Sequence, residues 1–202
     1  MDTKFEVMSA ALVLVGDSPV SAFSASGTPA QKVGFYLWDT QVGTVISSHP
    51  WRFATKDTLL SRDVTAPTTK WDATYAEPTG AKTIKNVYVG DSAVPIEFDR
   101  LEGKIHCNAT ATDSVYAEHT FVPSVTNWPD YFEDLVVLKL AGLLAVPAAA
   151  NLEMSKGFKE SYADALRVAK HTDSMQQTNR RLKTAGRDSL MEFRRHRGAY
   201  LR

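Results

Sequence analysis

The stretch that most constrains the fold runs from residue 128 to residue 146, with the sequence WPDYFEDLVVLKLAGLLAV. Pro129 stands where a helix would begin, because proline fixes φ near the helical value, and Pro147 stands where the helix is expected to end. The nearly continuous apolar run between them predicts a helix that is buried on most sides. Its length approaches that of a membrane span, but Lys139 near its middle argues against one. The sequence therefore predicts a central core helix over about residues 129–146 and no membrane segment.

Three further helices are predicted from apolar residues that recur at helical spacing. The first covers residues 3–15 and stops at Gly16, and the second covers residues 29–47 with Thr28 as its N-cap. The third, at residues 151–175, follows the core helix after a very short turn. We expect these last two helices to pack against each other as an antiparallel pair.

Residues 51–122 have the pattern of β structure. Trp51 and Phe53 alternate on one side of a predicted strand, and later extended runs are separated by turn residues. Pro95 lacks an N–H group, which places its run at the edge of a sheet. The predicted fold is α+β, a four-helix bundle core with an antiparallel β-hairpin insertion between helices 2 and 3 and an extended C-terminal tail. The side chains expected to anchor the core are Trp51, Phe53, Phe132, Leu135, Leu140 and Tyr162.

The size and composition of the chain suit one domain with an appended tail. The chain has 202 residues, of which 44% are hydrophobic, so residues 1–177 can bury a core and residues 178–202 form the tail. Cys107 is the single cysteine, which excludes an intrachain disulfide and favours folding in a reducing compartment. The N-terminal segment is a poor signal peptide. We therefore expect a protein made in a cytoplasm.

Charge is distributed unevenly although it sums to zero. Residues 178–202 hold eight basic and two acidic residues, a net charge of +6, so the rest of the chain carries −6. A solvated tail and a nucleic-acid-binding tail are alternatives, but aromatic residues are sparse and apolar anchors are present, which favours docking onto a protein. The residues expected to dock are Arg180, Arg181, Leu182, Lys183, Arg187, Leu190, Met191, Phe193, Arg194, Arg195 and Arg197.

One short motif invites an enzymatic interpretation. Gly16-Asp17-Ser18 follows an apolar run, as does the nucleophile block of GDSL-type serine hydrolases. That family also implies an Asp-x-x-His near the C-terminus and a Gly-x-Asn-Asp block, and this sequence has neither. A second Gly-Asp-Ser at residues 90–92 is typical of a hairpin turn. A small hydrolase that uses Ser18 is thus the less favoured alternative.

Metal binding and acid–base catalysis are weighed in the same way. His106, Cys107 and His119 could be proposed as metal ligands, but adjacent residues on a strand face opposite ways. We interpret them as one buried cysteine and two surface histidines. The acidic residues Asp130, Glu133 and Asp134 could be read as paired carboxylates, but they complement a helix N-terminus and need no catalytic role. No active site, cofactor or metal site is predicted.

The order of the predicted helices and strands, together with the sequences of two segments, points to a protein family. Two N-terminal helices lead into HPWRFATK at residues 49–56, a β-rich insertion follows, and the block at residues 132–145 opens the helical pair. This resembles the head-to-tail adaptors of tailed bacteriophages, the family called tail tubular protein A in short-tailed phages. The resemblance covers most of residues 5–175. It departs from the family at residues 71–80, where adaptors commonly have a Tyr-x-Tyr-Pro-Leu-Pro stretch.

The resemblance implies a structural role in the virion. Adaptors of this kind form a homo-oligomeric ring of about twelve copies at the head–tail junction, under the portal protein, with double-stranded genomic DNA passing through the channel. The β insertion would reach toward the tail nozzle or the next neck protein, and the C-terminal segment would dock on the portal. Another neck connector, a stopper or terminator, is the alternative within the same class, and density for residues 178–202 would distinguish the two.

Overall fold

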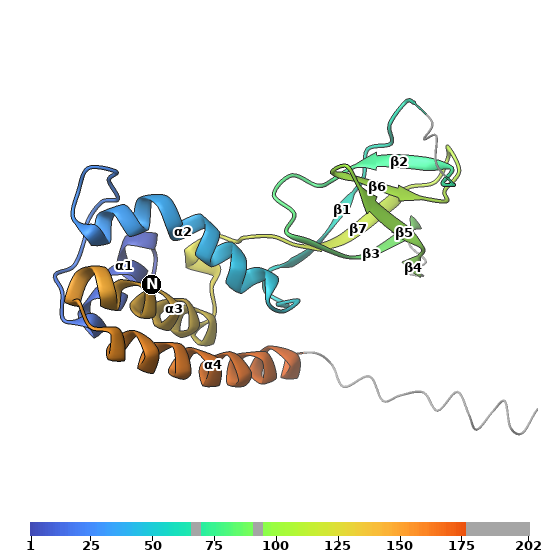
Figure 1. Ribbon diagram of the computed structural model, residues 1–202. Coiled ribbons are helices and arrows are strands. Elements are labelled where there is room, and N and C mark those ends of the chain that lie inside the picture. Colours follow the sequence, from blue (N-terminus) through green and yellow to red (C-terminus); the bar gives the residue numbers. More distant parts are fainter. Residues whose placement is uncertain (66–69, 91–94, 177–202) are drawn as a thin grey trace, which may run out of the picture.

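The computed structural model describes residues 1–65, 70–90 and 95–176, and the docking residues predicted in the tail lie outside this part of the chain. Figure 1 shows the helices gathered at one end of the molecule and the strands at the other. Two connecting segments join them, one after the second helix and one before the third. The helices of the described residues are α1 (Lys4–Val15), α2 (Pro29–Ser47), α3 (Asp130–Ala149) and α4 (Leu152–Met175), with a 3-10 turn at Val125–Asn127.

Local signals account for where the helices begin and end. The Thr28 hydroxyl accepts the N–H of Gln31, and the Gln31 side chain accepts the N–H of Thr28, so α2 begins with a complete capping box. Gly16 ends α1 with φ at +85°, a left-handed conformation that glycine adopts without strain. Pro147 does not end α3 as predicted. It lies in the last turns, where it removes only its own hydrogen bond, and the N–H of Ala150 still bonds to the Val146 carbonyl at 2.9 Å.

The helix α3 is the centre of the helical packing. It contacts α1, α2 and α4, and its buried residues belong to one continuous core with those of the other helices. At its crossing with α4 the Ser155 hydroxyl donates to the Gly142 carbonyl at 2.7 Å. A Cβ added at Gly142 would lie 3.4 Å from Phe158 Cβ, in van der Waals contact with α4.

The strands form two antiparallel sheets in the described residues. One sheet has the order β1-β7-β3-β4 and the other has the order β2-β6-β5. Pro95 lies in the edge strand of the first sheet, as predicted from its missing N–H. The strands are β1 (Thr55–Leu59), β2 (Ala73–Ala76), β3 (Thr83–Val89), β4 (Pro95–Ile96), β5 (Phe98–Leu101), β6 (Lys104–Cys107) and β7 (Val115–Thr120).

These two sheets contradict the prediction of a four-helix bundle core with a β-hairpin insertion. The strands bury a separate apolar cluster that includes Leu60, Tyr75, Val87 and Ile105, whereas a simple hairpin appended to a bundle would have no core of its own. The other helices pack on α3, the most buried helix, instead of sharing one bundle axis. The fold is mixed α+β, with a helical body that comprises α1 to α4 and a β region that comprises β1 to β7.

The Trp51–Phe53 alternation also has a different outcome from the strand predicted there. Residues 51–54 form a turn, and β1 starts only at Thr55. Trp51 is fully buried in the helical core, and its indole N–H donates to the Val45 carbonyl at 2.9 Å. The alternation thus places two aromatic rings in the helical body. Among the residues that the structure describes, no helix combines the length and apolarity needed to cross a membrane.

Candidate functional site

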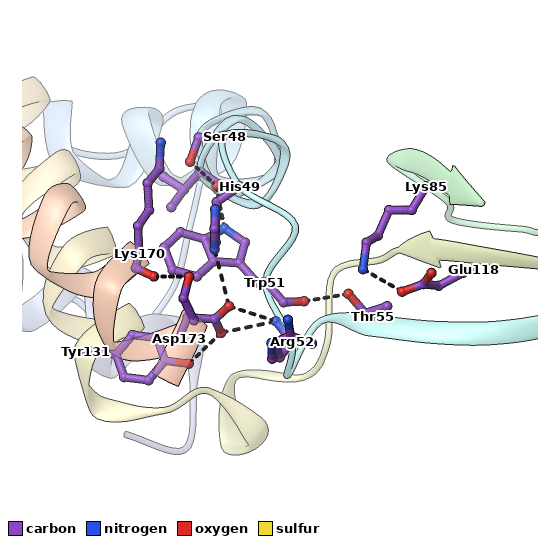
Figure 2. Close-up of polar contacts among 12 residues, drawn as sticks. Ser48, His49, Trp51, Arg52, Thr55, Lys85, Glu118, Tyr131, Lys170 and Asp173 are labelled. Carbon is purple, nitrogen blue, oxygen red and sulfur yellow. Dashed lines mark hydrogen bonds and ion pairs between the residues drawn. The ribbon is translucent and has the colours of Figure 1, made fainter. Parts of the chain in front are cut away.

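The most highly connected polar group in the helical body is the carboxylate of Asp173. Its two oxygens accept the backbone N–H of Arg52 at 3.1 and 3.2 Å, and one of them accepts the hydroxyl of Tyr131 at 2.9 Å. The Nε2 atom of His49 lies 3.4 Å from the other oxygen. Figure 2 shows these groups converging on Asp173, which lies on α4, from the segment after α2 and from the start of α3. We call Asp173, Arg52, Tyr131 and His49 the Asp173 joint.

Burial makes these contacts matter for the fold. Asp173 is only 1% exposed, and a carboxylate at such a position is tolerated only when hydrogen-bond donors replace the lost water. Burial and the hydrogen bond to Asp173 together raise the pKa of Tyr131 far above its ordinary value, so its hydroxyl remains a donor. Burial lowers the pKa of His49, although the nearby Asp173 opposes the shift. The joint thus holds three chain segments through one side chain.

An aromatic cluster packs beside the Asp173 joint. The Trp51 ring lies 5.3 Å from that of Phe132 and 6.3 Å from that of Tyr131, and Phe53 lies 4.8 Å from Phe132. Trp128 meets Phe132 edge-on at 5.0 Å. Of the predicted core anchors, Trp51, Phe132, Leu135 and Leu140 are fully buried. Phe53 and Tyr162 are partly buried and pack against the same core.

One signal in the sequence points to the Asp173 joint, namely the position of this acidic residue on the apolar stripe of its helix. Asp173 falls four residues after Ala169 and seven after Leu166, on the stripe that α4 buries. A carboxylate on the buried stripe of a helix needs buried donors, and the turn after α2 supplies the backbone N–H of Arg52. What could not be read from the sequence is that residues 49–52 lie beside residue 173, because 121 residues separate Arg52 from Asp173.

The other candidate residues lie apart from this joint. Ser18 is exposed in the loop after α1, and its N–H donates to the Asp17 carboxylate at 2.7 Å. A nucleophile elbow follows a strand, whereas this serine follows a helix. Gly90 has φ at +58°, and the Asp and Ser that follow it lie outside the described residues.

The histidines interpreted as surface residues are buried. His106 is 8% exposed and His119 is fully buried, so that interpretation is wrong, while Cys107 is buried as expected. His119 belongs to β7, which lies between β1 and β3 and is therefore an inner strand of its sheet. Within residues 1–65, 70–90 and 95–176, no group of three or more potential ligands is placed to hold a metal ion.

The three acidic residues at the start of α3 have separate environments. Asp130 and Asp134 are exposed, and Glu133 is buried with its carboxylate 3.0 Å from the amino group of Met1. They do not form a cluster around a common point. Glu133 therefore contributes an ion pair to the helical body.

Comparisons with known proteins add no relative to this description. No protein-family model matches the chain, and no curated protein matches its sequence. We therefore infer the function of the chain from its sequence and from the geometry described above.

Proposed function

We propose that this chain is a structural virion protein, a head-to-tail adaptor that forms a homo-oligomeric ring between the portal and the tail of a bacteriophage. The proposal rests on the resemblance of residues 5–175 to adaptors, which includes the segments at residues 49–56 and 132–145. In this role genomic DNA would pass through the ring channel. The net charge of −6 outside the tail suits such a channel, because a basic lining would retain phosphates.

The position of the Asp173 joint is compatible with a tail that docks on the portal. Asp173 lies two residues before the end of α4 at Met175, and the basic segment of residues 178–202 follows shortly afterwards. The joint connects this end of α4 to Arg52, immediately before the β region, and to Tyr131 in the core helix. A force applied to a docked tail would therefore pass directly into the core and into the start of the β region.

The docking role of the tail is tested by deleting residues 178–202. We expect the deletion to leave the circular dichroism spectrum of the helical body unchanged and to abolish binding to the portal of the same phage. The reason is that the core contacts described above all lie before residue 177. Loss of the folded spectrum, or portal binding equal to that of the full chain, would contradict the role proposed for the tail.

A matched set of charge substitutions separates specific docking from net charge. Replacing Arg180, Arg181 and Lys183 by glutamine removes three positive charges from the tail, and replacing Lys32, Lys156 and Arg167 removes three exposed charges from the body. We expect only the tail set to weaken portal binding. Equal weakening by the two sets would indicate a general charge effect and would contradict specific docking.

A further inference from the structure

An apolar crevice lies between α3 and α4 and is bordered by lysines. Leu143, Phe158 and Tyr162 contribute its apolar lining, and its volume is about 60 Å³. Lys139 and Lys159 also line it, with the ammonium group of Lys139 4.9 Å from the centre of the Tyr162 ring. The crevice is thus shaped for an aliphatic side chain that has acidic residues beside it.

The outer face of α1 carries the matching chemistry. Val13 is 62% exposed and Leu14 is 48% exposed, although the opposite face of the same helix is fully buried in the helical core. Glu6 lies seven residues before Val13, on the same side of the helix and about 10 Å away along its axis. Asp17 follows Gly16, the C-cap of the helix, and is exposed. An aliphatic pair is therefore flanked at both ends by carboxylates.

From this match we infer that the Val13–Leu14 face of one copy docks into the α3–α4 crevice of a second copy. The occupant is assigned by charge complementarity, since carboxylates flank the aliphatic pair and lysines flank the crevice. The two surfaces belong to different helices of one subunit, so the contact is heterologous and can repeat from copy to copy around a ring. This inference rests on the proposed ring and names the surfaces that would build it.

The test uses the full chain and two charge reversals, Asp17→Lys and Lys159→Glu, whose side chains are both exposed. Self-association is measured by sedimentation velocity at protein concentrations up to about 1 mM, the upper limit of weak contacts. We expect each variant alone to associate about tenfold more weakly than the wild type, because like charges then face each other. An equimolar mixture of the two variants should recover the association, because opposite charges then meet at both kinds of contact.

The apolar part of the contact has its own matched control. Val13→Ser should weaken association, whereas Val168→Ser, at 61% exposure on α4, should leave it unchanged. Normal circular dichroism spectra would show that the variants fold. A mixture that associates no better than its components, equal effects of the two serine variants, or a wild-type chain that stays monomeric at every concentration would overturn the inference.

Failure of this inference and failure of the proposed function give different results. If the protein associates but the variants have no effect, these two surfaces are excluded and another contact builds the ring. Portal binding and presence in the virion are measured in separate experiments, and they decide the adaptor role independently of the outcome here.

Discussion

The helical body and the β region differ in the kinds of side chains that they bury and in how well their buried polar groups are hydrogen-bonded. The helical body buries large rings, including Trp51 and Phe132, and satisfies its buried Asp173 with several donors. The β region buries a smaller cluster of mostly aliphatic and small side chains. It also buries the Nε2 atom of His119 with no hydrogen-bond partner among the described residues. Since an unsatisfied buried polar atom costs about 1–3 kcal/mol, we expect the β region to open first.

The largest loss of unfolding free energy should come from removing the ring of Phe132, which packs against several other aromatic rings of the helical body. Phe132→Ala removes a fully buried side chain that touches Trp51, Phe53 and Trp128, and we expect a loss of about 3–5 kcal/mol in unfolding free energy. Denaturation followed by helical circular dichroism measures it. The control Phe35→Ala removes a 55% exposed ring and should change stability by less than about 0.5 kcal/mol. Similar losses for both would show that burial does not distinguish these rings.

The Asp173 joint should rank second. Asp173→Ala leaves the Arg52 N–H and the Tyr131 hydroxyl without their acceptor, which we expect to cost about 1–3 kcal/mol. Hydrogen exchange at the Arg52 amide should also become faster. Asp164→Ala on the exposed side of α4 is the matched control and should have little effect, because its pair with Arg167 is solvent-exposed. Unchanged exchange at Arg52 in Asp173→Ala would contradict the joint.

A smaller effect, on the rate of thiol labelling, should show whether the β region opens independently of the helical body. Burial raises the pKa of the Cys107 thiol to about 11, so labelling of this thiol at neutral pH requires the β region to open. Ile105→Val should cost about 1 kcal/mol and speed labelling about fivefold, without changing the helical unfolding transition. Ile46→Val makes the same change in the helical core and should leave labelling unchanged. Equal acceleration by both would show that the two regions open together.

The smallest effect concerns pH and His49. The pKa of His49 is lower in the folded protein than its ordinary value of 6.5, so the unfolded chain takes up the proton first as the pH falls. The stability contributed by His49 is therefore fully present above pH 6.5 and is lost as the pH falls toward the folded pKa. Denaturation at several pH values should show this slope in the wild type and a shallower slope in His49→Gln. An identical slope in both proteins would contradict a titrating His49.

How much of this could be predicted from the sequence depended on how local each signal was. Caps such as Thr28 and Gly16 act within one turn, so they mark helix ends directly. The two sheets could not be predicted as such, because a pairing like that of β1 with β7 joins segments about sixty residues apart. The Trp51–Phe53 alternation suited a strand, yet packing against Tyr131 and Phe132 decided its conformation. The Asp173 joint was missed for the same reason of distance in sequence.

The most direct test of the proposed adaptor role is an image reconstruction of the neck of bacteriophage particles that contain this chain under the proposal. The account predicts a ring of copies between portal and tail, with residues 178–202 contacting the portal. Absence of the chain from purified particles, or its presence anywhere other than this junction, would contradict the account.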